Sequence, residues 1–132
     1  MIDHISLPVE NFSESIAFYD QTLKVIGCER LLTFQDKPEN GMAGYGKEGK
    51  ASFWITSNNN GQPLVNMPNV EVTFKAMSAD QVDQWHALCL KAGAQDVTAP
   101  AHYPDYHPGY YGACVIDPSG WRIEMVIHDY QK

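Results

Sequence analysis

This sequence of 132 residues has no long apolar run, no signal-peptide pattern and little positive charge. No segment approaches the roughly 20 apolar residues that a membrane helix needs, so no membrane association is expected. The opening stretch, MIDHISLPVE, lacks a basic region followed by an apolar run, so no signal peptide is expected. Positive charge is scarce as well, and the net charge is −7. Because a nucleic-acid-binding protein needs a basic face, this balance argues against that function.

Cysteine is also rare, and Cys28, Cys89 and Cys114 are far apart and odd in number. This spacing predicts neither a disulfide framework nor a zinc knuckle, so each cysteine is expected to be a small buried residue. Free thiols are typical of a reducing compartment, and a cytoplasmic protein is therefore expected. The length is typical of a single domain that can bury a core of its own.

The first part of the chain, residues 1–57, has the pattern of a strand, a helix and three strands. Residues 4–9 alternate as a strand does. Apolar residues then recur every three or four positions from Phe12 to Ile26, which predicts a helix that ends at Gly27. Further strands are expected at 28–34, 42–45 and 51–56. The segment 58–68 is rich in turn-forming residues and is predicted to be a linker.

The same order returns in residues 69–132. A strand is expected at 70–76, a helix begins after Ser78 and ends at Gly93, and strands follow at 95–98, 110–116 and 121–127. When the two halves of the sequence are aligned at an offset of about 67 residues, His4 aligns with Glu71 and the order of elements matches. The sequence therefore predicts an α+β fold in which two βαβββ modules form a curved mixed β-sheet trough flanked by helices.

Strand alternation indicates which side chains face that trough. In the last strand, the side chains of Arg122 and Glu124 point to one face. The apolar side chains between and after them point to the other face. His4 and Glu71 take the same parity in the first strands of the two modules. One imidazole and two carboxylates can hold a divalent transition metal, and a carboxylate can also act as a general base. The alternative is that these are solvated polar residues on a wet surface.

The segment 101–111 is dense in aromatic and imidazole side chains, with two histidines and four tyrosines. Loops on a rigid scaffold commonly carry binding groups, so His107 is a candidate acid–base residue. Of the neighbouring Tyr110 and Tyr111, one must face the trough, and Tyr111 is the favoured choice. The alternative is that prolines and tyrosines only stiffen the loop. His86 and His128 are expected at the surface.

Two stretches, DHISLPVENFSESIAFYDQTLKVIG and DPSGWRIEMV, resemble the vicinal oxygen chelate superfamily. That superfamily includes glyoxalase I, extradiol dioxygenases, methylmalonyl-CoA epimerase and the bleomycin- and fosfomycin-resistance proteins. The resemblance covers essentially the whole chain but is not specific for one member. It implies a small-molecule ligand and a homodimer, because members of the superfamily are commonly dimers.

The resemblance also implies a ligand set. In metal-dependent members, four trough-facing strand positions bind the ion, and they correspond here to His4, Trp54, Glu71 and Glu124. An indole cannot ligate a metal, so Trp54 would provide an aromatic wall for a ligand instead. The implied cofactor is one divalent ion of manganese, nickel, iron, magnesium or zinc, with no organic cofactor. Two carboxylates with one histidine favour a harder ion such as manganese or magnesium, or no metal.

Two hypotheses follow for the function. The first is a divalent-metal-dependent lyase, isomerase or dioxygenase, with His4, Glu71 and Glu124 as ligands and with Glu124 or His107 in catalysis. The second is a metal-free protein of the bleomycin-resistance type that binds or sequesters a small molecule. In either case Trp54, Tyr111 and Arg122 are the candidate substrate-binding residues. Whether the three candidate ligands bind a metal distinguishes the two hypotheses.

Overall fold

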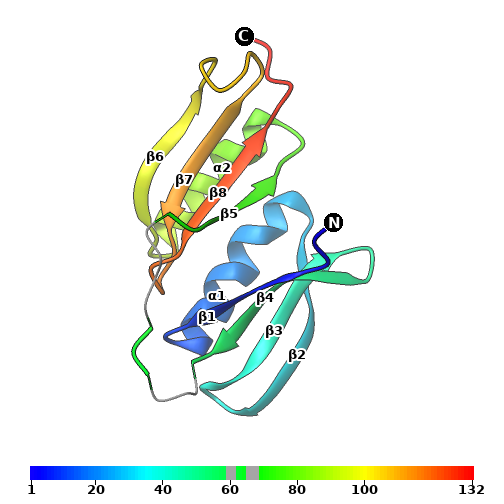
Figure 1. Ribbon diagram of the computed structural model, residues 1–132, viewed down its shortest axis with the longest axis vertical. Helices are drawn as coiled ribbons and strands as arrows, with labels where there is room; N and C mark the ends of the chain where they lie inside the picture. The colour runs from blue at the N-terminus through cyan, green and yellow to red at the C-terminus, as the bar shows by residue number, and fades with distance from the viewer. Residues whose placement is uncertain (59–61, 65–68) are drawn as a thin grey trace. The chain divides into compact units, whose positions relative to one another are not determined.

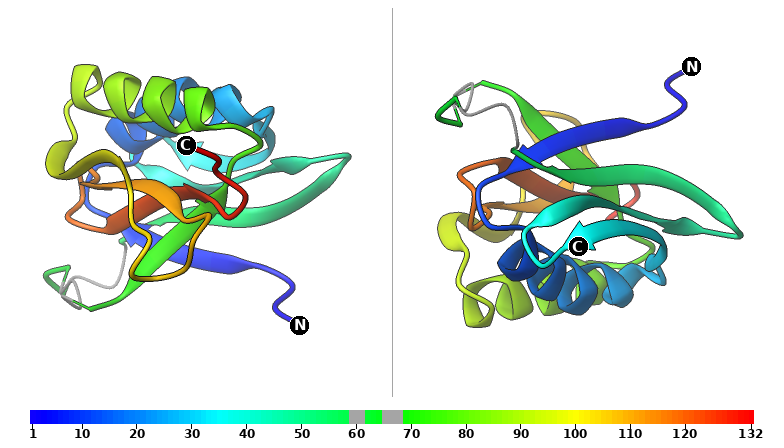
Figure 2. Two further views of the ribbon diagram at one scale, coloured as in Figure 1. Left: turned by 90° about the horizontal axis from the view of Figure 1, so that it is seen from above. Right: turned by 90° about the horizontal axis from the view of Figure 1, so that it is seen from below.

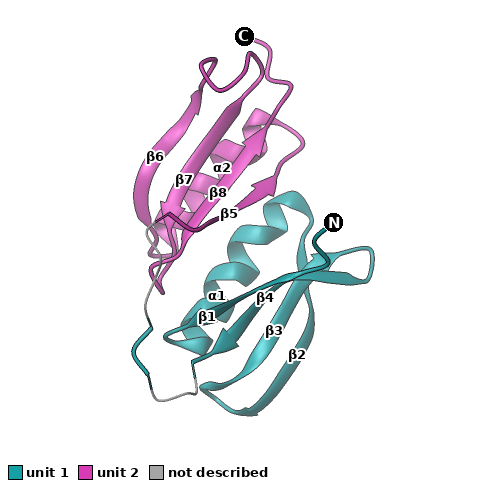
Figure 3. Ribbon diagram, viewed as in Figure 1, with its two compact units in different colours: residues 1–65 teal, residues 66–132 magenta. Residues whose placement is uncertain are grey.

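The computed structural model describes residues 1–58, 62–64 and 69–132 (Figure 1). The chain divides into two compact units, residues 1–65 and 66–132 (Figure 3). Most of the predicted linker, 58–68, lies outside the described residues. Within the described part of the chain, no helix combines the length and the apolar character needed to span a membrane.

Unit 1 is a four-stranded sheet with one helix. Its elements are β1 (Ile5–Val9), α1 (Phe12–Thr22), the short 3-10 helix η1 (Leu23–Ile26), β2 (Glu29–Lys37), β3 (Asn40–Lys47) and β4 (Lys50–Ser57). The strand order is β1-β4-β3-β2, with β1 parallel to β4 and the other pairs antiparallel. Parallel strands need a long connection, and the segment between β1 and β4, which contains α1 and the β2–β3 hairpin, provides one.

The ends of α1 follow from local side-chain chemistry. The side chain of Asn11 accepts a hydrogen bond from the amide of Glu14 at 2.9 Å, as a helix N-cap does. Glu39, from the β2–β3 turn, accepts a second one from the amide of Phe12 at 2.8 Å. At the other end, α1 stops at Thr22 and the chain continues as η1 up to Gly27, which has φ of 72°, a left-handed conformation that favours glycine. The helix start and the stop at Gly27 are as the sequence predicts, but the last turn is a 3-10 helix.

Burial in unit 1 follows the predicted alternation. Figure 2 shows each helix of the chain lying along one face of its own sheet. The apolar side of the unit 1 sheet packs with α1 to form a core of Leu7, Val9, Phe12, Phe18, Tyr19, Leu23, Ile26, Ala43, Tyr45, Phe53 and Ile55. The opposite sheet face stays partly open to solvent, and Phe34 and Met42 are exposed on it.

Unit 2 repeats this architecture. Its elements are β5 (Glu71–Lys75), α2 (Ala79–Lys91), β6 (Gln95–His102), β7 (Tyr111–Ile116) and β8 (Arg122–Ile127). The strand order is β5-β8-β7-β6, with β5 parallel to β8. Helix α2 packs on β6, β7 and β8. The core contains Val82, Trp85, Cys89, Ala113, Val115, Ile123 and Met125.

A tight turn at Asp117–Gly120 joins β7 to β8. The buried carboxylate of Asp117 accepts hydrogen bonds from the amides of Ser119 and Trp121, at 2.9 and 2.8 Å. Gly120 has φ of 94°. These contacts determine where β8 starts, and with it the position of every side chain on that strand.

The two units confirm the predicted fold class, an α+β chain in which βαβββ occurs twice and each sheet is mixed. A trough shared by both sheets remains a prediction from the sequence. The three cysteines are buried and free, as expected. His128 is exposed as expected, but His86 is buried, with its Nε2 atom 2.9 Å from Asp96 on β6. The expectation for His86 was wrong because β6 packs beside that edge of α2.

Candidate functional site

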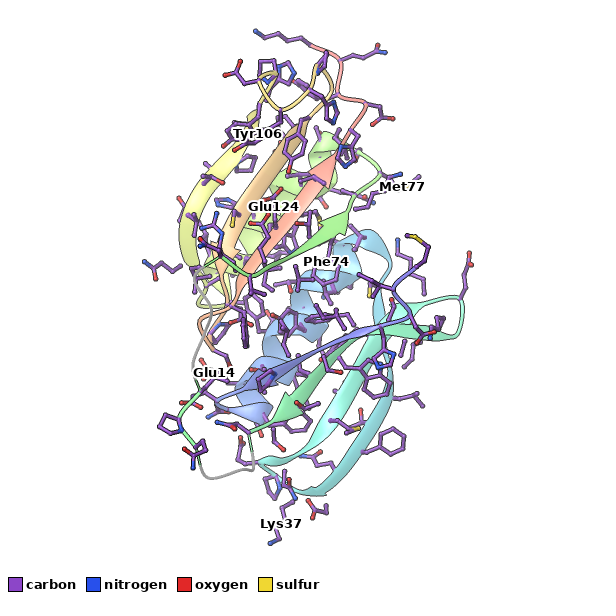
Figure 4. All side chains as sticks on the ribbon, in the orientation of Figure 1. Glu14, Lys37, Phe74, Met77, Tyr106 and Glu124 are labelled. Atoms are coloured by element: carbon purple, nitrogen blue, oxygen red, sulfur yellow. The ribbon has the colours of Figure 1, made fainter. Side chains whose placement is uncertain are left out.

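The strand register of unit 2 brings several polar side chains onto one face of the sheet. Glu71 on β5 pairs with Arg122 on β8 in the parallel ladder. Two residues further along β8, Glu124 pairs with Cys114 on β7. Because side chains alternate along a strand, all four lie on the sheet face that α2 does not cover. Figure 4 shows Glu124 over the middle of this sheet.

Three of these residues converge. Ligand atoms of Glu71, Cys114 and Glu124 all lie within 4.8 Å of one another. Glu71 is also paired with Arg122, whose Nε atom lies 3.3 Å from a carboxylate oxygen of Glu71. Two carboxylates, a thiol and a guanidinium therefore share one small area. This group is called the carboxylate cluster below.

Glu124 is the least exposed carboxylate of the cluster. Its half-buried position raises the pKa of its carboxyl group, mainly through desolvation, and the nearby carboxylate of Glu71 adds to this. A hydrogen bond from the hydroxyl of Tyr110 and the charge of Arg122 act in the opposite direction, but they do not cancel the rise. A carboxylate of raised pKa is a stronger base than an exposed one.

Two titratable neighbours of Glu124, the thiol of Cys114 and the hydroxyl of Tyr110, are held in their neutral forms. Burial raises the pKa of the Cys114 thiol to about 11. Burial and the neighbouring carboxylate raise the pKa of the Tyr110 hydroxyl far above its ordinary value. Tyr110 therefore acts as a hydrogen-bond donor to Glu124, and Cys114 remains a thiol unless a cation binds next to it.

A small cavity of about 80 Å³ opens beside Glu124. Its lining residues are Thr98, Tyr103, Tyr106, Tyr110, Gly112, Ala113, Cys114, Arg122 and Glu124. The rings of Tyr106 and Tyr110 meet edge to face, with centroids 5.1 Å apart. Tyr103, Tyr106 and Tyr110 thus form one wall of the cavity, and Figure 4 shows Tyr106 in the loop beyond β6. A small molecule in this cavity would contact both phenol rings and a carboxylate.

Tyr111 does not lie where the sequence placed it. Its hydroxyl donates a hydrogen bond to Asp83 of α2 at 2.7 Å, and its ring packs on Tyr130 with centroids 4.6 Å apart. It is Tyr110 that reaches Glu124. The choice between the two tyrosines was wrong because it depends on the register of β7 against β8. A signal was present, since Tyr111 has the same parity as the buried Ala113 and Val115 of β7.

His107 lies behind Tyr110 and does not line the cavity. Its Nδ1 atom accepts a hydrogen bond from the amide of Gly109 at 3.2 Å. The neutral ring then carries its proton on Nε2, which lies 2.7 Å from Nδ1 of His128. Its ring meets that of Tyr110 edge to face at 5.5 Å. Both ring nitrogens are thus engaged, Nδ1 within the loop and Nε2 with His128 after β8, and a catalytic function of His107 remains a prediction.

His4 and Trp54 lie in unit 1 and line one cavity of about 310 Å³. The Nδ1 atom of His4 lies 2.7 Å from the carboxylate of Asp3, which also pairs with Lys50 at 2.7 Å. His4 is largely exposed. Their shared face agrees with the predicted alternation, because Ser6 of β1 pairs with Trp54 of β4.

Trp54 lies flat over its own sheet. A Cβ atom placed on Gly44, the residue opposite Trp54 on β3, would come within 2.7 Å of the indole. The indole stacks with Phe34, with centroids 6.3 Å apart and an interplanar angle of 14°. Gly44 therefore provides the space that the flat indole needs. The result is an aromatic surface beside the His4 cavity.

The sequence-predicted residues thus form two groups. Glu71, Arg122 and Glu124 meet in unit 2, and His4 and Trp54 meet in unit 1. Sequence reasoning missed Cys114 and favoured Tyr111 over Tyr110. A buried cysteine looks like any small core residue in a sequence, and only the strand register places it opposite Glu124.

Comparisons with solved structures agree with this fold. A glyoxalase/bleomycin resistance protein from Albidiferax ferrireducens is 26% identical, with a TM-score of 0.80 over 94% of this chain and 96% of that one. A variant of glyoxalase I from Zea mays is 19% identical, with a TM-score of 0.69 over 95% of this chain and 45% of the maize protein.

A third structure holds a metal. It is a variant of the fosfomycin resistance protein FosX from Listeria monocytogenes, complexed with Mn(II) and 1S,2S-dihydroxypropylphosphonic acid. It is 14% identical, with a TM-score of 0.68 over 99% of this chain and 90% of that one. At this identity the likeness to FosX, like that to the maize enzyme, shows a shared fold alone.

Two sequence comparisons complete the picture. No curated protein matches the chain. A family model described as the glyoxalase/bleomycin resistance protein/dioxygenase superfamily matches residues 1–125, which is nearly the whole chain. The chain therefore belongs to the glyoxalase/bleomycin resistance protein/dioxygenase superfamily.

Proposed function

We propose that this protein is a divalent-metal-dependent enzyme that acts as a lyase, isomerase or dioxygenase on a small molecule. The observation that carries the proposal is the convergence of Glu71, Cys114 and Glu124 within 4.8 Å beside a tyrosine-lined cavity. Family membership supports it, because the superfamily includes metal-dependent enzymes.

The donor atoms of the cluster suit a divalent ion. Carboxylate oxygens bind manganese, magnesium, iron and zinc, and a cysteine sulfur favours the softer ions of this group, zinc above all. The thiol of Cys114 would lose its proton on binding, since a coordinating thiol is deprotonated by the ion. His4 enters the proposal through the family resemblance, and its contribution is tested with its own variant.

The residues around the cavity have distinct tasks in this proposal. A bound divalent ion would supply Lewis-acid stabilisation of negative charge on substrate oxygens. Tyr106 and Tyr110 contact the substrate and exclude water from the cavity. Glu124 is either a ligand or the base that removes a proton from the substrate, and its raised pKa suits the second task.

The proposal is tested by the metal content of protein purified without chelators and without a metal-affinity tag. Elemental mass spectrometry should find about one equivalent of a divalent metal per chain, as expected for a single metal site. Glu124→Ala should lose this metal. Glu29→Ala removes an equal charge from an exposed position on β2 and should retain it. His4→Ala should bind the metal more weakly if His4 is a ligand.

A second candidate function is a metal-free protein that binds a flat or apolar small molecule. Two observations favour it: Arg122 already neutralises Glu71, and the indole of Trp54 is held flat beside a cavity of about 310 Å³.

If no metal binds after incubation with manganese, nickel, iron and zinc salts, the enzyme proposal is wrong. The search should then turn to ligands that quench tryptophan fluorescence in the wild type but not in Trp54→Phe. If metal binds, 2-oxoaldehydes, catechols and epimerisable acids are the first substrates to screen.

A further inference from the structure

Arg122 is the one residue of the carboxylate cluster that cannot bind a metal. It lies on the same sheet face as Glu71 and Glu124, and its Nε atom is 3.3 Å from Glu71. The guanidinium interacts favourably with Glu71 and Glu124, and its pKa is raised as a result. Arginine is always charged in proteins, so this positive charge is permanent.

The charges of the cluster show what Arg122 does there. The thiol of Cys114 is neutral, Glu71 and Glu124 are carboxylates, and Arg122 is the single cation. Among the residues that the structure describes, no other lysine or arginine forms an ion pair with either carboxylate. Arg122 therefore halves the negative charge that would attract a divalent ion.

The guanidinium also engages one carboxylate oxygen of Glu71. A divalent ion held by Glu71, Cys114 and Glu124 must therefore either displace Arg122 from that oxygen or share the carboxylate with it. It must also stay close to a fixed positive charge, which repels it. Both effects act against metal binding and both come from one side chain.

From this geometry we propose that Arg122 is a resident cation that competes with the divalent ion for Glu71 and so determines how tightly the site binds metal. Arg122 is a positioning residue, because it acts through Glu71. The inference rests on the metal site proposed above and adds its control: the site exchanges an internal cation for an external one. Removing the guanidinium should therefore strengthen metal binding, whereas loss of an ordinary metal-site residue weakens it.

The test measures metal affinity in the full chain after removal of metal with a chelator. Zinc and manganese are titrated separately by equilibrium dialysis into the wild type and into Arg122→Leu, which has no ligand atom. Arg122→Leu should bind at least one of these ions about tenfold more tightly, from the loss of a unit charge a few ångströms away. Arg122→Lys retains the charge and should stay close to the wild type.

Two controls separate a specific effect from a general one. Lys91→Leu removes the same charge from the last turn of α2 and should leave the affinity within about twofold, because that charge is exposed and lies on the other side of the sheet. In a Glu71→Gln background, Arg122→Leu should give a clearly smaller gain, because the competition acts through Glu71. Circular dichroism and thermal unfolding confirm that each variant is folded.

The outcomes distinguish this inference from the proposed function. If the wild type binds metal but Arg122→Leu binds it equally or more weakly, the inference is wrong and the metal site stands. If only Arg122→Leu binds metal, the inference is supported and the metal-dependent function of the native chain is contradicted. If neither binds, both are overturned. An equal gain in Lys91→Leu would also overturn the inference, because net charge alone would then explain it.

Discussion

The hydroxyl of Tyr110 donates a hydrogen bond to the carboxylate of Glu124 on β8, on the sheet face that α2 leaves uncovered. Tyr110 stands just before β7, next to Tyr111, whose hydroxyl bonds to Asp83 of α2 instead. Two adjacent tyrosines thus serve opposite faces of one sheet. This arrangement, with the carboxylate cluster around it, leads to the first two predictions.

Tyr110→Phe should raise the pKa of Glu124 further, because the hydrogen bond that it removes is one of the influences that lower that pKa. The titration of the Glu124 carboxyl carbon, followed by NMR, measures the change. Tyr111→Phe is the matched control, since it removes a hydroxyl on the opposite face and should leave the titration unchanged. If the pKa of Glu124 shifted in Tyr111→Phe but not in Tyr110→Phe, then Tyr111 and not Tyr110 would lie on the sheet face of Glu124.

Glu124 should make the stability of the protein depend on pH. Its pKa is higher in the folded chain than the ordinary value of 4.5, so the folded state holds its proton more strongly than the unfolded state. The resulting stability is complete below the ordinary pKa and is lost as pH rises through the folded pKa. Glu124→Gln has no carboxyl group to titrate, so this loss is absent. As pH rises through the folded pKa of Glu124, the free energy of unfolding of the variant should therefore increase relative to that of the wild type. Urea unfolding followed by tryptophan fluorescence measures the difference.

Glu39 is the internal control for that experiment, because its pKa shifts the other way. Hydrogen bonds from Ser13 and Phe12 lower the pKa of its carboxyl group. Its stabilising effect is therefore present above the ordinary pKa and is lost as pH falls. Glu39→Gln should be destabilised at neutral pH, and its difference from the wild type should shrink in acid. If both variants followed the same pH trend, the assigned shift of Glu124 would be wrong.

Gly44→Ala should displace the indole of Trp54, because the added methyl group would come within 2.7 Å of it. Overpacking of this kind destabilises a protein by about 1–3 kcal/mol. Urea unfolding measures the loss, and the tryptophan emission spectrum should shift as the indole moves. The same substitution in a Trp54→Leu background should cost clearly less, since the clashing ring is gone. An equal cost in both backgrounds would show that the indole is not the cause.

Asp117→Ala should destabilise the β7–β8 turn, because two amides would lose their acceptor in a buried place. An unsatisfied buried donor costs about 1–3 kcal/mol. Asp117→Asn keeps one acceptor oxygen and should restore part of the loss. Thermal unfolding of the three proteins gives this order. A wild-type melting temperature in Asp117→Ala would show that the turn does not depend on these bonds.

Much of the fold could be predicted from the sequence because its local signals agree with one another. The helical segment that starts at Phe12 stops at Gly27 as predicted, with a 3-10 turn after Thr22, since apolar spacing and a left-handed glycine are local properties. Strand alternation placed Arg122 and Glu124 together on one face of β8 for the same reason. The second βαβββ module followed from the repeat of these patterns.

The candidate site could be predicted only in part, because a site depends on which strands are neighbours and in what register. Alternation within β8 identified the face of Glu124 from the sequence alone. It could not show that Cys114 lies opposite Glu124, or that Arg122 lies opposite Glu71, because strand pairing joins residues that are distant in the chain.

The sequence by itself determined the element order, the helix starts, the buried stripe of each helix and the faces of most strands, because these depend on neighbours along the chain. Only the tertiary structure decided that Tyr110 reaches Glu124 and that His86 is buried against Asp96. It also decided that Arg122 forms an ion pair with Glu71. Each of these contacts joins residues that lie apart in the sequence and that strand register and helix packing bring together.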